Sequence, residues 1–552
     1  MDSLKISLPS SHFLQSPQYI IIEKASEGIS VPGENDHNSI NLAQLLQGLE
    51  SLQIWGDEGI PITGLAYHSG RVEPGDVFVA IKGNCTDGHL FIPQAIARGA
   101  RAVVLEETVE PVPGVVFVRT ADSRRALAHL AAVFYNHPTQ DLTLIGITGT
   151  NGKTTTSYLL ESIWGASGAR VGVIGTVNCR FGREVRPSPV TTPESLDLQG
   201  LLADMRAALV DCAIMEVSSH ALDLQRAHGC RFAGAIFTNL SQDHLDYHGH
   251  MEAYFEAKSR LFTDYLASNG ASDRLAVVNR DDPWGKKLLQ RLATPTLTYG
   301  FEAGVEIRPE SYTLTPQEVR AVLATPFGRL EVVAPLVGRH NLYNILAASS
   351  AALGLGIAPD QVVAGLAVLT GVDGRLEPVA VPGQPLVLVD YAHTPDALHK
   401  VLQAVRDLQF ERLITVFGCG GDRDRGKRPL MGQAAARGSD LVIVTSDNPR
   451  TEDPLTIIAD IEEGLRDLGF PRLELGEIAG ARQGYTVVPD RRQAIRSAVA
   501  LGKPGEVILL AGKGHETYQI LGTRRIHFDD REAAREALLA SSRADSEPEE
   551  SF

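Results

Sequence analysis

The sequence predicts an α/β protein with three domains, in which a small N-terminal α/β domain precedes two larger doubly wound domains. Three observations support this prediction. The 552 residues of the chain exceed what one ordinary hydrophobic core accommodates. Short apolar runs alternate with helical patterns in three successive blocks, as in parallel sheets with helices on both faces. A glycine-rich loop between one such strand and the next helix is typical of a phosphate-binding loop.

The first block, from about residue 41 to 140, has the pattern of a small α/β domain. It contains predicted strands at Val77–Ile81, Ala102–Leu105 and Val115–Val118 and predicted helices at Ile92–Arg98 and Ser123–Phe134. His137 and Pro138 form a turn signal that ends the block. Residues 1–40 show no sustained periodicity, so we expect a loose extension there.

The second and third blocks predict the two doubly wound domains, at residues 141–371 and 372–540. The second block contains strand patterns at Leu142–Thr148, Val171–Val177, Ala213–Val217 and Ala233–Thr238 and a helical pattern at Ser195–Leu209. The third contains strand patterns at Leu386–Asp390, Leu413–Phe417, Leu441–Thr445 and Val507–Ala511 and helical patterns at Ala397–Leu408 and Asp490–Ala500. Residues 541–552 are acidic and rich in serine, which predicts a solvated tail.

Composition excludes several classes of function. A formal net charge of −16 disfavours nonspecific binding to nucleic acid or to a membrane surface. No run of about 18 apolar residues occurs, and the N-terminus lacks the pattern of a secretory signal. The five cysteines are scattered without metal-ligand spacing, which favours reduced thiols. We therefore expect a cytoplasmic protein that binds no nucleic acid and does not insert into a membrane.

The strongest local signal is the segment IGITGTNGKTTT at residues 145–156, where an apolar strand leads through a glycine-rich turn into a helix. Glycines let backbone amides face phosphate oxygens, and the helix N-terminus favours an anion. Lys153 would reach the β- and γ-phosphates, and the Thr154 hydroxyl would bind Mg²⁺. The generic pattern requires glycine six residues before Lys153, where this chain has Ile147. The alternative is a turn rich in Gly and Thr that binds no ligand.

Carboxylates and histidines follow two further strands of the central block. Glu216 ends a predicted strand and could share Mg²⁺ with Thr154, although a solvated carboxylate is the alternative. His244 and His248 lie among carboxylates, a pattern compatible with zinc, with a general base or with hydrogen-bonding surface histidines. Lys258 follows in a helical pattern, which by itself indicates an exposed lysine.

Later loops carry weaker signals for anions and for a nucleoside. Arg375 could pair with phosphate and Asp390 with a ribose hydroxyl, but single charged residues in loops are more often caps or solvated charges. Residues 418–428 are dense in glycine and charge, and Arg423 there could meet an anion. The alternative for this segment is a flexible charged loop.

Several of these segments resemble the Mur ligase and folylpolyglutamate synthase superfamily. The loop TGTNGKT at residues 148–154 resembles the superfamily's phosphate loop, and NLSQDHLDYHG at residues 239–249, followed by Ala257-Lys258, resembles the Mur ligase pattern. The resemblance extends from about Tyr67 to Glu516 and is closest to the MurE type. Members of that type use ATP to add a diamino acid to UDP-N-acetylmuramoyl-L-alanyl-D-glutamate.

The resemblance implies a three-domain Mur ligase architecture, with a UDP-binding N-terminal domain, a central ATP-binding phosphate-loop domain and a C-terminal Rossmann-like domain that binds the amino acid. It implies Lys153, Lys258 and His244 as catalytic residues and two Mg²⁺ ions, with Thr154, Glu216, His244 and a carbamylated Lys258 (N6-carboxylysine) as ligands. The implied ATP contacts are Gly149, Thr150, Asn151, Gly152, Lys153, Thr154, Thr155, Asn341, Asn344, Arg375 and Asp390.

The resemblance also implies two substrate sites. The muramoyl dipeptide is expected to contact Ser69, Thr191, Thr192, Ser218 and Arg226. Meso-diaminopimelate is expected to contact Arg423, Asp447, Asn448, Pro449, Arg450, Gly512 and Glu516. The first domain departs from the family, because Tyr67-His68-Ser69-Gly70 stands where members often read Tyr-Asp-Ser-Arg, with Arg71 next along.

The implied reaction forms an acyl phosphate from the dipeptide carboxylate and ATP, which the amine of the diamino acid then attacks. Positioning and cancellation of charge would perform most of this chemistry. The alternatives are a lysine-adding Mur ligase, a folylpolyglutamate synthase and a nucleotide-binding scaffold without turnover. We expect the chain to act as a monomer.

Overall fold

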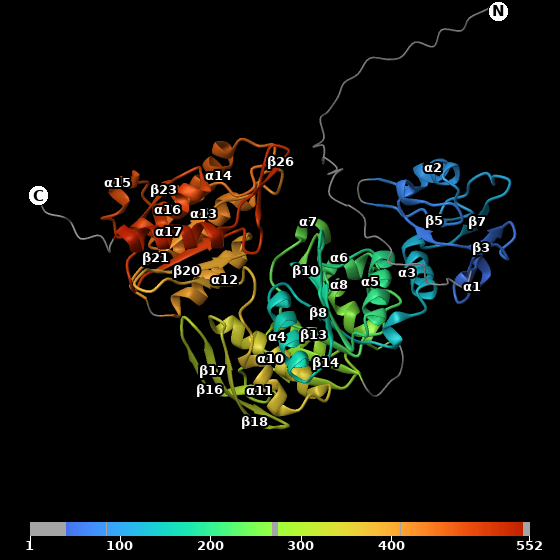
Figure 1. The fold of residues 1–552 in the computed structure, drawn as a ribbon, viewed down its shortest axis with the longest axis horizontal. Coiled ribbons are helices and arrows are strands. Elements are labelled where there is room, and N and C mark those ends of the chain that lie inside the picture. The colour runs from blue at the N-terminus through green and yellow to red at the C-terminus, as the bar shows by residue number, and fades with distance from the viewer. Residues whose placement is uncertain (1–39, 84–85, 268–273, 409, 545–552) are drawn as a thin grey trace, which may run out of the picture.

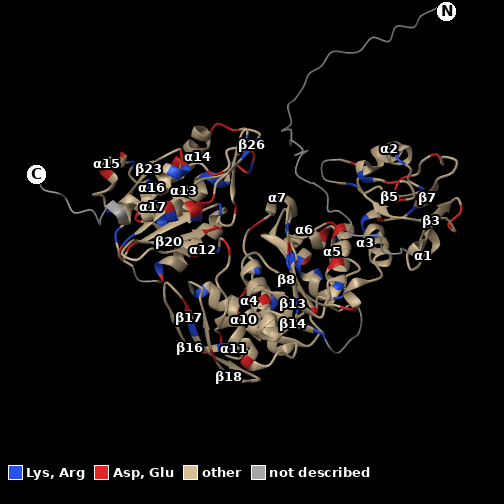
Figure 2. Ribbon diagram, viewed as in Figure 1, with Lys and Arg blue, Asp and Glu red and all other residues tan. Residues whose placement is uncertain are grey.

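The computed structural model describes residues 40–83, 86–267, 274–408 and 410–544. The chain forms three α/β units in sequence order, and the middle unit lies between the other two (Figure 1). Lys and Arg are interspersed with Asp and Glu over all three units (Figure 2). Residues 1–39, where we expected a loose extension, lie outside the described residues.

The N-terminal unit is built on a sheet with strand order β2-β7-β6-β5-β4, in which β4 to β7 are parallel and the edge strand β2 is antiparallel. Helices α1 and α3 pack on one face and α2 on the other. Its elements are β1 (Ile40–Asn41), α1 (Leu42–Leu46), β2 (Gln53–Trp55), β3 (Pro61–Ile62), β4 (Leu65–Ala66), η1 (Ser69–Arg71), β5 (Val77–Val79), η2 (Gly88–Phe91), α2 (Ile92–Ala97), β6 (Ala102–Leu105), β7 (Val116–Arg119) and α3 (Ser123–Phe134).

The middle unit has an eight-stranded sheet of order β11-β10-β9-β12-β8-β13-β14-β15, parallel from β9 to β15. Helices α4, α10 and α11 cover one face, and α5 and α8 the other. Its elements are η3 (Pro138–Gln140), β8 (Thr143–Thr148), α4 (Lys153–Ala166), β9 (Val171–Ile174), β10 (Asn178–Phe181), β11 (Glu184–Pro187), α5 (Ser195–Ala207), β12 (Cys212–Glu216), α6 (Ser219–Asp223), β13 (Gly234–Phe237), α7 (Leu245–His248), α8 (Met251–Arg260), η4 (Leu261–Leu266), β14 (Leu275–Asn279), α9 (Pro283–Leu289), β15 (Thr296–Tyr299), β16 (Arg308–Leu314), β17 (Val319–Thr325), β18 (Gly328–Ala334), α10 (Arg339–Gly354) and α11 (Pro359–Ala367).

The C-terminal unit has a six-stranded sheet of order β19-β20-β24-β21-β22-β23, parallel except for the edge strand β19. Helices α12, α13 and α14 cover one face, and α16 and α17 the other. Its elements are β19 (Glu377–Val379), β20 (Leu386–Asp390), α12 (Pro395–Arg406), β21 (Leu413–Phe417), α13 (Lys427–Gly438), β22 (Leu441–Val444), α14 (Pro454–Asp467), α15 (Leu475–Ile478), β23 (Gly484–Val487), α16 (Arg491–Leu501), β24 (Val507–Ala511), β25 (Tyr518–Leu521), β26 (Arg524–His527) and α17 (Asp530–Ala544).

The predicted α/β class and its two doubly wound sheets are confirmed, and most predicted elements agree with the structure within a few residues. Two features differ. The antiparallel sheet β16-β17-β18 was not predicted, because β16 is largely exposed and has no apolar run. Helix α17 continues to Ala544, past residue 541 where the predicted tail begins. Among the described residues, no helix is both long and apolar enough to span a membrane.

The topology gathers the predicted loops at sheet edges. Since parallel strands end at one edge, the segments after β8, β12 and β13 lie together in the middle unit. In the C-terminal unit the segments after β20, β21, β22 and β24 lie together in the same way. The loops at this edge of the middle sheet and the loops at this edge of the C-terminal sheet can therefore contribute to one site.

Candidate active site

The phosphate loop leaves β8 and enters α4 through two glycines in the left-handed region. Gly149 has φ 146° and Gly152 has φ 88°. A Cβ atom on Gly149 would lie 1.9 Å from Thr238 Oγ1, and one on Gly152 would lie 2.4 Å from Asn344 Oδ1. Only glycine therefore fits at these two positions, and the backbone of the loop packs closely against its neighbours.

Two lysines point at one carbonyl oxygen of this loop. Lys153 Nζ donates to Gly149 O and to Thr150 O, both at 2.9 Å, and Lys258 Nζ donates to Gly149 O at 2.9 Å. Lys258 is 1% exposed, so the alternative of an exposed helical lysine is wrong. Burial, and then the charge of Lys153, lower the pKa of Lys258 well below its ordinary value. Burial also lowers the pKa of Lys153.

Glu216 is buried, and its hydrogen bonds connect the phosphate loop to the loop after β9. Its Oε2 accepts the Thr154 hydroxyl at 3.0 Å and the Thr176 hydroxyl at 2.9 Å, and its Oε1 accepts the Thr176 amide at 3.0 Å. It is 1% exposed, so it is not a solvated carboxylate. Hydroxyl and carboxylate oxygens side by side at a helix N-terminus are ligands that Mg²⁺ prefers.

His244 lies in the segment between β13 and α7 with φ 52°. Its ring stands 4.9 Å from the ring of His220 and 6.2 Å from that of Tyr254, centroid to centroid. Burial lowers the pKa of its imidazole, which keeps the ring neutral and able to act as a ligand. Within the described part of the chain, no three His, Cys, Asp or Glu side chains are grouped so that they could hold a metal ion. The zinc alternative for His244 and His248 therefore gains no support.

Four of the five predicted dipeptide residues gather beside Glu216. Thr191 Oγ1 lies 3.2 Å from Thr176 Oγ1, and Thr192 Oγ1 donates to Glu216 O at 2.9 Å. The Ser218 amide donates to Thr192 Oγ1 at 3.1 Å, and Arg226 Nη1 donates to Thr192 O at 3.1 Å. Ser69 lies apart from them in the N-terminal unit, where its hydroxyl donates to Gln94 Oε1 at 2.8 Å.

The predicted nucleotide residues beyond the loop are largely occupied by internal hydrogen bonds. Asn344 Nδ2 donates to Asn341 Oδ1 at 2.9 Å, and Asn341 Nδ2 donates to Val337 O at 2.8 Å. The two oxygens of Asp390 accept the amides of Leu376 and Ala392, each at 2.8 Å, so this carboxylate joins the segment before β19 to the loop after β20.

The middle and C-terminal units meet beside the phosphate loop. Arg375 of the C-terminal unit donates from Nη2 to Thr154 Oγ1 at 3.4 Å. Asp396, in the first turn of α12, accepts from Ser241 Oγ at 2.7 Å and from Asn151 Nδ2 at 3.5 Å. Side chains of both units therefore border one site.

The predicted diamino-acid residues lie together at the carboxyl edge of the C-terminal sheet. Asn448 Nδ2 donates to Glu516 Oε2 at 2.9 Å, and Arg450 Nη1 donates to Gly421 O at 2.8 Å. Burial and the neighbouring Arg423 lower the pKa of the Arg450 guanidinium, while the carboxylates of Asp447 and Glu516 act in the opposite direction. Pro449 lies in the loop after β22 with Asn448 and Arg450, and Gly512 lies in the loop after β24 with Glu516. Arg423, in the loop after β21, is exposed.

Sequence reasoning missed two residues of this site. Thr176 holds both oxygens of Glu216 but lies in a loop without a motif. Lys513 is fully buried between Asp447 and Glu516. The segment AGKGHE at residues 511–516 could have indicated Lys513, but only Gly512 and Glu516 of this segment were predicted to contact diaminopimelate.

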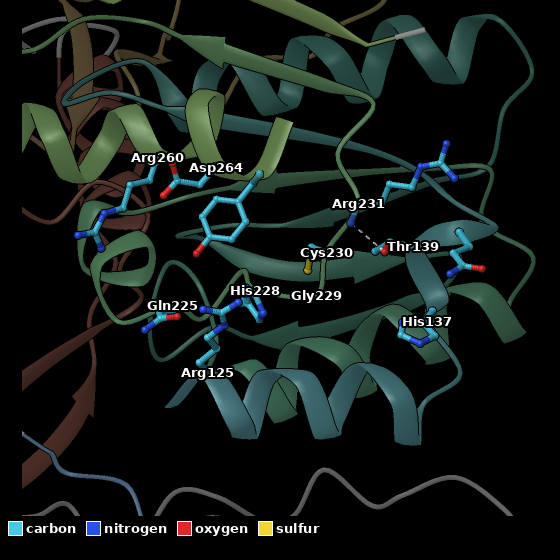
Figure 3. A pocket seen from close by; sticks show the side chains of 12 residues that line it. Arg125, His137, Thr139, Gln225, His228, Gly229, Cys230, Arg231, Arg260 and Asp264 are labelled. Atoms are coloured by element: carbon cyan, nitrogen blue, oxygen red, sulfur yellow. Dashed lines mark hydrogen bonds between the residues drawn. The ribbon is translucent and has the colours of Figure 1, made fainter. Parts of the chain in front are cut away.

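One cavity lies in a different place in the molecule. It has a volume of about 680 Å³, with Arg125, Gln225 and His228 at one end and His137 at the other (Figure 3). It lies at the edge of the sheet opposite the phosphate loop, because its lining residues Thr139 and Cys230 precede β8 and β13. The lining contains none of the predicted site residues.

Three family models match the chain in order. The model described as "Mur ligase family, catalytic domain" matches residues 61–135, "Mur ligase middle domain" matches residues 147–352, and "Mur ligase, glutamate ligase domain" matches residues 374–514. The matches include the phosphate loop and most of both larger units.

Individual proteins match over almost the whole chain. A Geobacter metallireducens protein named UDP-N-acetylmuramoyl-L-alanyl-D-glutamate--2,6-diaminopimelate ligase is 47% identical over 496 residues, which is 89% of this chain and 97% of the relative. A solved structure of that name matches with a TM-score of 0.66 at 34% identity and covers 91% of this chain and 99% of its own. A MurF ligase from Thermotoga maritima in complex with ADP shares the fold, with a TM-score of 0.58 at 20% identity over 87% of this chain and 98% of its own.

Proposed function

The chain belongs to the Mur ligase family, and we propose that it is an ATP-dependent ligase that joins meso-2,6-diaminopimelate to UDP-N-acetylmuramoyl-L-alanyl-D-glutamate in peptidoglycan precursor synthesis. The observation that supports this most directly is the meeting of two sheet edges, where Arg375 of the C-terminal unit contacts Thr154 of the phosphate loop. The relatives are named for diaminopimelate, which favours this proposal over lysine-adding and folate-directed alternatives. Intact Lys153, Glu216 and Lys258 argue against a scaffold without turnover.

The proposed reaction forms an acyl phosphate before the amide bond. The carboxylate of the bound dipeptide attacks the γ-phosphate of ATP, ADP leaves, and the amine of diaminopimelate attacks the acyl phosphate and releases phosphate. Lys153 neutralises charge on the transferred phosphoryl group, and the loop from Gly149 to Thr155 holds the phosphates with the backbone amides at the N-terminus of α4. Thr191, Thr192, Ser218 and Arg226 hold the dipeptide, and Ser69 contacts its UDP portion. Asn341, Asn344, Arg375 and Asp390 are proposed to border the remainder of the nucleotide.

The residues present suit the proposed Mg²⁺ ions. Thr154 and Glu216 offer oxygen ligands 3.0 Å apart beside the phosphate loop, and His244 offers a neutral imidazole. When bound, Mg²⁺ supplies positive charge to phosphate oxygens. Near His244 the carboxylate of Asp243 is present, with its Oδ2 atom 3.4 Å from His244 Nε2, and a modified Lys258 could supply a second anionic group for another ion.

We propose that Lys258 is that group, in the form of a carbamate. The motif resemblance suggests it, and the burial of Lys258 beside Lys153 disfavours a second ammonium there. The neutral amine adds to carbon dioxide, which forms one N–C bond and releases one proton. The product carries two oxygens and a negative charge, as a Mg²⁺ ligand requires.

The three units have distinct proposed tasks. Residues 41–140 bind UDP, residues 141–371 bind ATP and residues 372–540 bind the amino acid. We propose that the enzyme works in the cytoplasm, where ATP is available, and that it acts as a monomer.

Amino-acid choice gives a test of this function. Diaminopimelate carries a carboxylate beside its distal amine, whereas lysine carries only the ammonium, and Arg450 can bind that carboxylate through two hydrogen bonds. We expect wild type to release phosphate with the dipeptide and diaminopimelate and to prefer diaminopimelate over lysine at equal concentration. Arg450→Ala should lose about 1.5–3 kcal/mol of this preference, or one to two decades. Phosphate release is measured in competition with each amino acid.

The matched control is Arg437→Ala, which removes an arginine from the last turn of α13 in the same unit. It should keep the rate and preference of wild type. Equal use of lysine by wild type would overturn the choice of diaminopimelate, and an unchanged preference in Arg450→Ala would overturn the role of that arginine.

A further inference from the structure

Lys513 occupies an unusual position for a lysine. It follows β24 in a tight turn between Gly512, with φ 114°, and Gly514, with φ 51°. Its side chain has no exposed surface. A fully buried ammonium is costly unless charged partners surround it, so its neighbours indicate what it does.

Those neighbours are three residues already placed at the diamino-acid site. Lys513 Nζ lies 3.0 Å from Glu516 Oε2, 3.4 Å from Asn448 Oδ1 and 3.6 Å from Asp447 Oδ1. Asn448 Nδ2 donates to the same oxygen of Glu516 at 2.9 Å. Lys513 and Asn448 together fix the Glu516 carboxylate from two sides.

Asp447 remains incompletely satisfied. The residue is 8% exposed, and among the described residues its Oδ1 atom has no hydrogen-bond donor, since Lys513 Nζ at 3.6 Å is too distant. A buried carboxylate oxygen without a donor is destabilising. Because this oxygen is enclosed by protein and has no donor, no hydrogen bond neutralises its negative charge, which therefore acts on the surrounding side chains.

The charges of the inner pocket balance. Asp447 and Glu516 contribute two negative charges, and Lys513 and Arg450 contribute two positive charges. Behind them, the buried pair of Arg491 with Asp530 is itself neutral. Arg423 is exposed, so solvent screens part of its charge, although that charge still acts on Arg450.

We propose that Lys513 sets the amino-acid specificity of this pocket by making it electrically neutral. The inference rests on the proposed function. A neutral pocket complements the distal end of diaminopimelate, which carries one ammonium and one carboxylate. The distal end of lysine carries a single positive charge, which Lys513 and Arg450 oppose. Without Lys513 the pocket has one net negative charge and complements a bare ammonium.

The inference is tested with the full chain, the muramoyl dipeptide and ATP, with diaminopimelate or lysine as the varied substrate. Lys513→Met removes the charge but keeps most of the volume. We expect its KM for diaminopimelate to rise by about tenfold to a hundredfold, with the KM for ATP unchanged. The ratio of kcat/KM for lysine over diaminopimelate should rise at least about tenfold. Lys513→Arg keeps the charge and should retain the preference for diaminopimelate.

The matched control is Lys503→Met, which removes an exposed lysine from the same unit and should behave as wild type. Thermal unfolding shows whether each variant is folded. An unchanged ratio in a folded Lys513→Met, or a shift toward lysine in Lys513→Arg, would overturn the charge argument. If Lys513→Met does not fold, Lys513→Arg alone decides between these outcomes. If wild type used neither amino acid, the proposed function itself would fail, and this inference with it.

Discussion

Lys153→Ala is expected to abolish ATP-dependent ligation while it leaves the fold intact. Lys153 is the first residue of α4, and its ammonium is held by two carbonyls of its own loop, Gly149 O and Thr150 O. These contacts place a positive charge in the loop where we propose that the phosphoryl group is transferred. Loss of such a group costs on the order of a hundredfold to a thousandfold in kcat. Phosphate release with saturating substrates measures the effect.

The fold should tolerate this change because the contacts of Lys153 lie within one loop. We expect the unfolding midpoint to move by less than about 4 °C. Lys286→Ala is the matched control, since Lys286 is an exposed lysine of the same unit that pairs with Glu302. Turnover within a few-fold of wild type in a folded Lys153→Ala would refute the assignment of the phosphate loop.

Lys258→Ala is expected to lose ligation by a hundredfold or more, on the order of the loss for Lys153, and to recover part of it with added short carboxylates. A carbamate on Lys258 would give the site an anion beside His244, and a free carboxylate can replace that anion in the space left by the side chain. Restored activity would separate a missing anion from a damaged fold. Lys287→Ala, at a half-buried lysine paired with Glu252, serves as control.

The modification also has a readout that does not depend on activity. Protein equilibrated with carbon-13 bicarbonate should show one carbamate signal by NMR in wild type and in Lys287→Ala, and none in Lys258→Ala. Full activity of Lys258→Ala, together with an unmodified Lys258 in wild type, would contradict the proposal.

The sequence predicted the parts of this fold that depend on local patterns. The strands β8, β21 and β24 are continuous apolar runs, and Gly149 and Gly152 occupy backbone conformations that only glycine adopts easily. The sheet β16-β17-β18 was missed because its buried positions alternate with more exposed ones, as Val319, Ala321 and Leu323 of β17 alternate with Arg320 and Val322. The signal there was an alternation with a period of two rather than a continuous run.

Tertiary contacts account for what the sequence could not supply about the site. Lys258 on α8 has the pattern of an exposed helical lysine, yet the phosphate loop covers it. Lys513 is buried only because the segments after β22 and β24 converge across the sheet. Asp390 resembles a ligand-binding carboxylate, but its two oxygens accept the amide of Leu376, before β19, and the amide of Ala392 in its own loop. The functional roles of these residues stay predictions.

The mass of the product tests the central claim most directly. The full chain is incubated with UDP-N-acetylmuramoyl-L-alanyl-D-glutamate, ATP, Mg²⁺ and equal amounts of diaminopimelate and lysine, and the UDP-linked products are analysed by mass spectrometry. We expect one dominant product, the dipeptide precursor extended by diaminopimelate, formed in step with ADP. Release of ADP without an extended precursor, or equal formation of the lysine product, would contradict it.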